Sequence, residues 1–138
     1  TNIGGIAGES KGTITQCRND GQVSKVAGVI CKTVNLGGLV GKNGEAARLS
    51  NSKNYGNVNS ETDTLVNLGG ICGILYNNSI VELCENNGAI SGSGKEIIPN
   101  EDTNTNCASC TSNNGGSAST DDFGQLNIGI IYGKYQEI

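Results

Sequence analysis

Hydrophobic and polar residues recur along this chain in short blocks rather than in long periodic runs. The block NLGGLVG at residues 35–41 has close copies that begin at Asn2 and Asn67, and an altered copy that begins at Asn127. The leading asparagines are 33, 32 and 60 residues apart. A fixed period of roughly 20–50 residues is typical of solenoids and other repeat architectures. The pattern therefore predicts stacked repeats rather than a conventional globular core.

A second repeated block follows each of the first three copies. The segments 14–23, 49–58 and 81–90 align on an unvarying Asn-x-Gly and keep aliphatic residues at both ends. The apolar runs are short, partly β-branched and bounded by Gly and Asn, which favours strands over helices. The Gly4-Gly5 pair between Ile3 and Ile6 predicts a bend that turns the second isoleucine inward. Each unit of about 32 residues is thus interpreted as one coil of a parallel β-solenoid.

The predicted fold is all-β: one domain over residues 1–138, forming a short right-handed parallel β-solenoid of about three and a half coils. The coils span 2–34, 35–66 and 67–126, with a partial coil at 127–138. The third coil exceeds the period by about 28 residues, which predicts a loop insertion at 95–122 that contains Pro99, the only proline. This segment is either an interaction surface or a tolerated excursion of low closure cost.

Stacking also predicts two ladders of asparagine side chains. Equivalent residues of neighbouring coils lie about 4.8 Å apart, so identical amides can bond one another. The expected ladders are Asn2, Asn35, Asn67 and Asn127, and Asn19, Asn54 and Asn86. The alternative is that these amides bind Ca²⁺. It is disfavoured because calcium sites use several carboxylates and only Asp20 lies in these corners.

The combined pattern resembles a known family. Gly-Gly-(Ile/Leu)-x-Gly followed by Cys-x-Asn-x-Gly-x-(Val/Ile) is similar to the GLUG motif, and it matches residues 4–23, 37–58 and 69–90, with a half match at 129–133. The resemblance implies an extracellular repeat module, as in bacterial adhesins and the non-catalytic parts of immunoglobulin A peptidases, and it supplies no catalytic residues. Two departures stand out. Ser52 replaces a Cys, and Ile130 replaces the second Gly of the last copy, which predicts a different bend in the final coil.

Composition narrows the function classes. The net charge is −4 without a basic run, which leaves little to hold nucleic acid. No apolar run approaches the roughly 20 residues that span a bilayer. Histidine is absent, so no histidine base is available, and the acidic pairs at 101–102 and 121–122 are more typical of solvated loops than of glycosidase sites. We therefore predict no enzyme, no cofactor, no metal, no nucleic-acid partner and no membrane span.

Six cysteines raise the choice between metal and disulfides. Cys107 and Cys110 form a C-x-x-C without the four ligands of a zinc site, and we interpret them as a candidate local disulfide in the insertion. Cys17 and Cys84 share a repeat column but lie two coils apart, about 9.6 Å, which is too far for a disulfide. Cys72 occupies a packing position in the glycine block, and Cys31 has no evident partner.

The two ends of the solenoid are expected to be unprotected. The chain begins at one glycine block and ends just past another, without a capping helix, so both end coils would offer unpaired strands. The candidate joining residues are Ile3 and Ile6 at one end and Ile128 and Ile131 at the other. Either adjacent coils of a longer chain cover these ends, or copies stack end to end into an open filament.

The function hypothesis follows from these expectations. It is a non-enzymatic structural and adhesion module of a secreted or cell-surface protein, with a self-stacking filament subunit as one form and a host surface or glycan as partner. The alternative is a carbohydrate-binding or carbohydrate-processing β-helix module. The scarcity of aromatic residues counts against it, and Tyr55 and Tyr76 are the candidates for stacking on a sugar.

Overall fold

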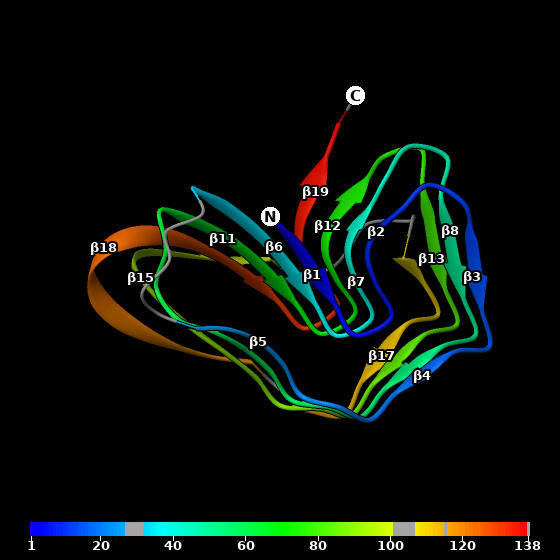
Figure 1. The fold of residues 1–138 in the computed structure, drawn as a ribbon, viewed down its shortest axis with the longest axis horizontal. Coiled ribbons are helices and arrows are strands. Elements are labelled where there is room, and N and C mark those ends of the chain that lie inside the picture. The colour runs from blue at the N-terminus through cyan, green and yellow to red at the C-terminus, as the bar shows by residue number, and fades with distance from the viewer. Residues whose placement is uncertain (27–31, 101–106, 115, 138) are drawn as a thin grey trace.

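Parallel strands stacked between successive coils form the framework of the computed structural model, which describes residues 1–26, 32–100, 107–114 and 116–137 (Figure 1). Sheet A has seven strands, in the order β1 (Asn2–Gly4), β6 (Thr33–Gly37), β11 (Leu65–Gly69), β18 (Gly116–Gly129), β15 (Ile90–Asn100), β10 (Val58–Ser60) and β5 (Val23–Lys25). The parallel β-solenoid predicted from the repeat is confirmed.

Three four-stranded sheets complete the coils. Sheet B contains β19 (Tyr132–Gln136), β12 (Cys72–Tyr76), β7 (Val40–Asn43) and β2 (Ala7–Ser10). Sheet C contains β16 (Cys107–Ala108), β13 (Ile80–Glu82), β8 (Arg48–Ser50) and β3 (Thr13–Thr15). Sheet D contains β17 (Thr111–Ser112), β14 (Glu85–Asn86), β9 (Lys53–Asn54) and β4 (Arg18–Asn19).

Each coil contributes one level to this stack. We call β1–β5 coil 1, β6–β10 coil 2, and β11–β14 with residues 90–94 coil 3; coil 4 comprises β16, β17, β18 and β19. The strand register equals the sequence alignment: Asn2 pairs with Asn35, Asn35 with Asn67, and Asn67 with Asn127. Coils of equal length keep each residue type in its own column, which is why the repeat could be aligned from the sequence.

The interior consists of two separate hydrophobic cores. One lies between sheets B, C and D and includes Leu39, Leu49 and Ile71. The other is enclosed by sheet A and includes Leu36, Val58 and Leu68. Both run along the stack because each column repeats an aliphatic residue.

A row of glycines, at which the backbones of sheets A and B approach closely, separates the two cores. A Cβ atom added to Gly41 would lie 2.5 Å from the backbone nitrogen of Ile3 and 2.7 Å from the carbonyl oxygen of Asn35. Only glycine lets the strands of sheets A and B approach this closely. The glycine block is therefore repeated because the chain folds back on its own backbone at this point in every coil.

The segment predicted as a loop insertion at 95–122 is not a loop. Its described residues form much of β15 and β18, together with β16 and β17, and β16 and β17 extend sheets C and D by one level. The prediction was wrong because this stretch lacks the glycine block, so its repeat is invisible in the sequence. The interval of 60 residues holds almost two coils.

Strands β15 and β18 exchange places within sheet A. Residues 90–94 of β15 pair with 116–120 of β18, and after a register shift residues 96–100 pair with 125–129. Residues 125–129 also pair with β11, so they lie between β11 and the outer half of β15. If the coils continued to stack regularly, residues 96–100 would pair with β11. Asn127 and Gly129 match β11 instead, and they take that position. Figure 1 shows β15 and β18 running side by side.

This exchange makes the two ends of the stack different. Both terminal strands of sheet A, β1 and β5, belong to coil 1, because β15 and β18 join the two faces of that sheet at the far end. Within its described residues, the chain has no helix that could cross a membrane.

Candidate functional site

The outer face of coil 1 is the first candidate site. Ile3 and Ile14 are only partly buried, and Ile6 is 39% exposed. The residues in the same columns of coil 2 are completely buried: Leu36, Leu39 and Leu49. Coil 1 therefore presents aliphatic side chains of the core columns that a neighbouring coil covers on one side only. We call Ile3, Ile6 and Ile14 the coil-1 ledge.

The first asparagine ladder ends at this face. Asn127 Nδ2 donates to Asn67 Oδ1 at 2.7 Å, and Asn67 donates to Asn35 at 2.8 Å. Asn35 in turn donates to Asn2 Oδ1 at 2.8 Å. Among the described residues, the Nδ2 of Asn2 donates to no partner. The outermost amide of the ladder can therefore bond a further strand.

The second ladder runs in the opposite direction. Asn19 Nδ2 donates to Asn54 Oδ1, and Asn54 Nδ2 donates to Asn86 Oδ1, each at 2.8 Å. Asn86 donates to the hydroxyl of Ser112 at 3.2 Å in coil 4. Each asparagine also bonds the backbone of its own Asn-x-Gly corner, as Asn54 does with Gly56. These bonds satisfy buried amides, which would otherwise cost about 1–3 kcal/mol each.

The ladder explains one departure from the repeat. A Cβ atom on Gly38 would lie 2.4 Å from the Asn54 amide nitrogen, and one on Gly70 would lie 2.7 Å from that of Asn86. In coil 4 the ladder position is the shorter Ser112, and Ile130 replaces the glycine. The amide that would collide with a side chain is therefore absent in the coil that carries the isoleucine.

The opposite end of the first ladder is capped. The outer half of β15 places Ile98 beside Asn127 and Pro99 beside Ile128. Gln125 Nε2 donates to Asn127 Oδ1 at 3.2 Å, which ends the ladder internally. Proline has no N–H to offer a further strand and is a common device for protecting sheet edges.

The joining residues predicted at this end were wrong. Ile128 is only 8% exposed and Ile131 only 4% exposed, because strands β15 and β19 are integrated into the stack. They are core residues, and little of either side chain is exposed. At the other end, Ile3 and Ile6 do lie at the outer face.

A buried ion pair anchors coil 1 to coil 2. Lys25 Nζ lies 3.0 Å from Asp63 Oδ2, and their side chains are 5% and 0% exposed. Nearby, the Thr62 hydroxyl lies 2.6 Å from that of Ser93 and donates to Asp121. This hydrogen bond, with a smaller one from the backbone of Asp122, lowers the pKa of the exposed Asp121 carboxyl. Polar contacts thus tie successive coils together at this corner.

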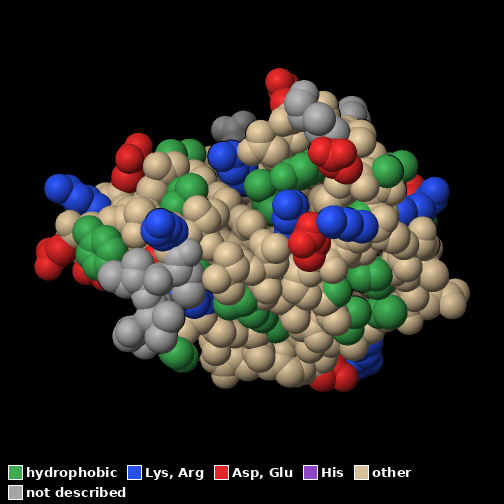
Figure 2. Space-filling view, turned by 45° about the horizontal axis from the view of Figure 1, so that its top comes forward, with side chains coloured by type: hydrophobic (Ala, Val, Ile, Leu, Met, Phe, Trp, Pro, Cys, Tyr) green, Lys and Arg blue, Asp and Glu red, His purple; other side chains and the backbone are tan. Residues whose placement is uncertain are grey.

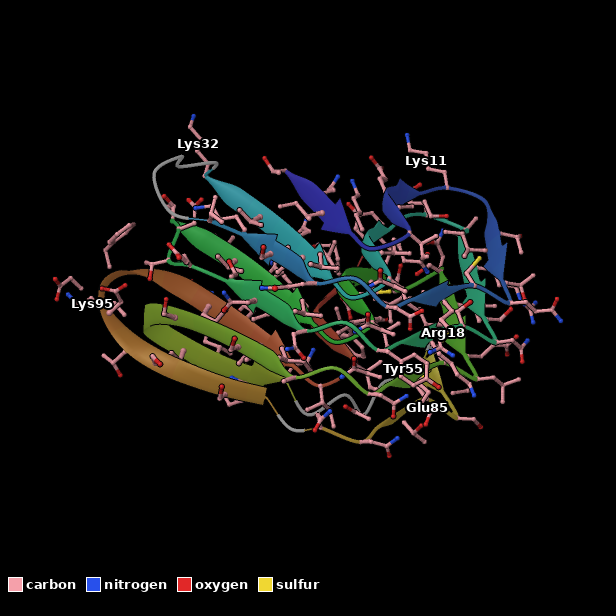
Figure 3. The ribbon with its side chains drawn as sticks, turned by 60° about the horizontal axis from the view of Figure 1, so that its bottom comes forward. Lys11, Arg18, Lys32, Tyr55, Glu85 and Lys95 are labelled. Atoms are coloured by element: carbon pink, nitrogen blue, oxygen red, sulfur yellow. The ribbon has the colours of Figure 1, made fainter. Side chains whose placement is uncertain are left out.

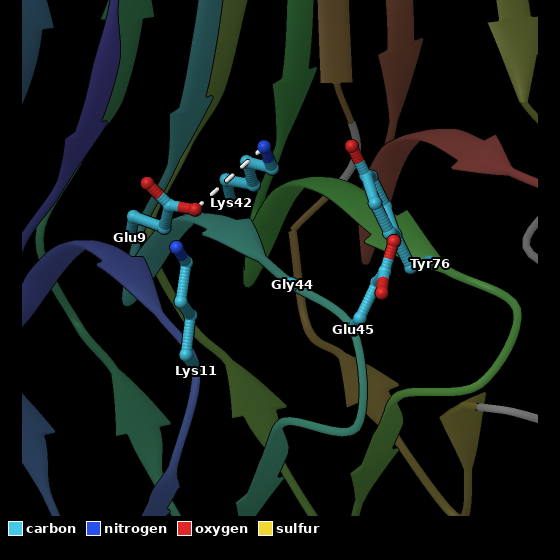
Figure 4. A pocket seen from close by; sticks show the side chains of 6 residues that line it. All are labelled: Glu9, Lys11, Lys42, Gly44, Glu45 and Tyr76. Carbon is cyan, nitrogen blue, oxygen red and sulfur yellow. Dashed lines mark ion pairs between the residues drawn. The ribbon is translucent and has the colours of Figure 1, made fainter. Parts of the chain in front are cut away.

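A charged hollow on sheet B is the second candidate site (Figure 4). It has a volume of about 420 Å³ and is lined by Glu9, Lys11, Lys42, Glu45 and Tyr76, together with Gly44. Lys42 Nζ lies 3.6 Å from Glu9 Oε1 and 5.2 Å from the centre of the Tyr76 ring. A hydrogen bond with Tyr76 raises the pKa of Lys42, opposed in part by burial and supported by the charge of Glu9.

Tyr76 is the tyrosine that lines this charged hollow. Tyr55 is partly exposed, but the guanidinium of Arg18 stacks 4.1 Å from its ring centre, as Figure 3 shows from below. Tyr132 is buried and Tyr135 packs against the core. The sequence hypothesis named Tyr55 and Tyr76 together, and the structure separates their environments.

The candidate disulfide between Cys107 and Cys110 stays a prediction, because the side chain of Cys107 lies outside the described residues. Cys72 and Cys84 are buried thiols. Burial raises the pKa of Cys72. Cys31 lies outside the described residues. Within the described ranges no three or more His, Cys, Asp or Glu side chains are grouped to hold a metal ion.

The face of the molecule in Figure 2 shows acidic and basic side chains interspersed, without a large patch of one sign.

Comparisons with protein-family models, with curated proteins and with solved structures give no match to this chain. The resemblance to GLUG repeats therefore rests on the residue pattern alone, and it stays a prediction.

Sequence reasoning missed the hollow on sheet B. The signal was available, because the repeat offset of 33 places Glu9 opposite Lys42, as the register shows. Opposite charges in adjacent coils on an outward row indicate a paired surface row. Tyr76 could not be added from that offset, because Gly44 stands in its column of coil 2.

Proposed function

We propose that this chain is a non-enzymatic structural and adhesion module of an extracellular surface protein, which associates through the outer face of coil 1. The observation that carries the proposal is the contrast between that face and the opposite end. Coil 1 offers the coil-1 ledge, the outermost ladder amide and an edge strand in every sheet. At the opposite end, sheets B, C and D end in β19, β16 and β17, whereas sheet A has no terminal strand there. The extracellular setting is supported by the GLUG-like pattern.

The proposed occupant is the coil-1 face of a second copy. Unpaired strands and an apolar ledge are satisfied together by another coil edge, which supplies backbone bonds and buries isoleucine. The opposite end fits less well, because Pro99 on the outer half of β15 has no N–H to donate to a matching strand. Contact between identical faces has two-fold symmetry and closes as a dimer. The proposal replaces the open filament with a closed pair.

Three isoleucines of nearly equal exposure provide the test. Ile6 on the coil-1 face is 39% exposed, and Ile80 on the lateral sheet C is 41% exposed. Ile98 is also 41% exposed, and it lies on the outer half of β15, which we call the capping strand. We expect Ile6→Lys to shift the light-scattering mass to the monomer value. Ile80→Lys and Ile98→Lys are expected to keep the wild-type mass. Far-ultraviolet circular dichroism checks that all three variants fold.

Each other outcome is informative. Loss of association in both Ile6→Lys and Ile98→Lys would mean that unlike ends meet, as in a filament, and would overturn the closed pair. A wild-type chain that stays monomeric at high concentration would overturn the choice of a second copy as occupant.

The charged hollow on sheet B favours a second function, binding of a glycan. Tyr76 offers an aromatic face, and Glu9, Glu45 and Lys42 offer hydrogen-bonding groups around it. Saccharide recognition commonly uses an aromatic platform with a few placed polar groups. In a glycan array, Tyr76→Ala is expected to lose binding that Tyr55→Ala retains. Equal binding by both variants would exclude this site.

A further inference from the structure

Cys84 and Cys110 occupy one column in adjacent coils. Glu82 pairs with Ala108 and Glu85 with Thr111, so the register places Cys84 opposite Cys110. The backbone nitrogen of Thr111 donates to the carbonyl oxygen of Cys84 at 3.0 Å. Neighbouring strands lie about 4.8 Å apart, which is inside the range of roughly 4.4–6.8 Å between Cα atoms in disulfides.

Their side chains point in the same direction. The Cys84 thiol lies 3.4 Å from the carbonyl oxygen of Glu82, and the Cys110 thiol lies 3.8 Å from the equivalent oxygen of Ala108. Cys110 Sγ also lies 3.7 Å from the carbonyl oxygen of Val81 in coil 3. Two sulfurs on parallel side chains in adjacent coils need little backbone movement to bond.

Exposure gives the pair a route to oxidation. Cys110 is partly exposed, whereas Cys84 is buried beneath coil 4. A small oxidant can reach the first sulfur and leave the second to close the ring. The other members of the column do not compete, because Ser52 separates Cys17 from Cys84.

We propose that Cys84 and Cys110 form a disulfide that fastens coil 4 to coil 3, with a low-molecular-weight disulfide such as oxidised glutathione as the oxidant. The Cys110 thiolate attacks the glutathione disulfide, forms a mixed disulfide and releases one glutathione. The Cys84 thiolate then attacks the Cys110 sulfur and releases the second. Two protein thiols lose two protons and two electrons, and one disulfide is reduced to two thiols.

The bond would stabilise the part of the fold that departs from the regular repeat. It closes a segment of 26 residues that contains β15, one of the two strands that exchange places. Constraining a loop of this size in the unfolded chain raises the thermal midpoint by on the order of 10 °C. The hydrogen bond with Cys110 and burial raise the pKa of Cys84, so ring closure is expected to accelerate as the pH rises.

Serine variants test the pairing with little risk to the fold. Ser52 already occupies this column in coil 2, where its hydroxyl donates to the carbonyl oxygen of Ser50 at 2.9 Å. The folded chain is incubated with oxidised glutathione, and its thiols are counted by alkylation and mass spectrometry. The wild type is expected to lose two thiols and gain thermal stability. Cys107→Ser should behave like the wild type, and Cys84→Ser should not form the bond.

The opposite pattern would overturn the proposal. Loss of the bond in Cys107→Ser with retention in Cys84→Ser would mean that the C-x-x-C pair forms instead. Retention of all six thiols in the wild type after incubation with oxidised glutathione at pH 8.5 would exclude the disulfide.

Discussion

The two ends of this solenoid solve the same problem differently. At the far end, β15 and β18 exchange places, so a strand with Ile98 and Pro99 covers the end of the first asparagine ladder. At the near end, coil 1 has the same columns without a cover, and Ile6 is 39% exposed. The comparison shows that a repeat determines how coils stack, and that departures from the repeat determine where stacking stops.

Both ends rest on the same regular body, in which three kinds of contact recur: buried amide ladders, close glycine contacts and aliphatic columns. Because coil 1 has a neighbour on one side only, substitutions there are expected to cost less than identical substitutions one coil inward. The following predictions test that difference, from the largest effect to the smallest.

Asp63→Asn is expected to have the largest effect. It leaves Lys25 buried without its counter-charge, and breaking one side of a buried pair costs about 3–5 kcal/mol of unfolding free energy. Urea denaturation measures the loss. The control is Asp20→Asn, which breaks the exposed pair with Arg18 and should cost less than about 1 kcal/mol. Equal costs would mean that the Lys25 pair does not fasten coil 1 to coil 2.

Gly56→Ala should destabilise the fold by about 3 kcal/mol, at the upper end of overpacking effects. Its added Cβ would lie 1.8 Å from the carbonyl oxygen of Gly21 in coil 1. The same change at Gly21 meets nothing closer than the Asn19 side chain at 3.6 Å. Thermal unfolding of the two variants isolates the effect of a neighbouring coil. Similar midpoints would contradict the stacking described here.

Asn54→Ala is expected to cost about 2–3 kcal/mol, because it leaves ladder partners unsatisfied in coils 1 and 3. Asn2→Ala removes one terminal acceptor and should cost about 1 kcal/mol. Chemical denaturation of both variants gives the ratio. A larger effect at Asn2 would contradict the expected difference between outer and inner coils.

Pro99→Thr should have the smallest effect on stability, within about 0.5 kcal/mol for a surface position. It restores an N–H on the capping strand, so we expect association at that end to appear in light scattering. If this variant keeps the mass of the wild type at every concentration, the proline is not what protects the edge.

The regular coils could be predicted from the sequence because identical residues at equal spacing within one chain reveal the register of the strands. Asn35, Asn54 and Gly56 recur in columns, and equal spacing was enough to align them. Ile128 and Ile131 were misplaced because the exchange of β15 with β18 depends on competition between two strands for β11. No local pattern reports that competition.

The column of Cys110 was also concealed by substitution. Ser112 and Asn114 replace the Asn and Gly of the corner, yet the Ser112 hydroxyl still donates to the carbonyl oxygen of Asn114 at 2.7 Å. The same local bond is made by Asn86 with Gly88. The geometry is kept while the residue types that identify it are lost.

The most direct test of the asymmetry between the ends is the limiting mass of the wild-type chain in sedimentation equilibrium at rising concentration. Association through the coil-1 face alone predicts a plateau at twice the chain mass of 14.1 kDa. Continued growth beyond that plateau would mean that both ends accept partners, and it would contradict the capped end described here.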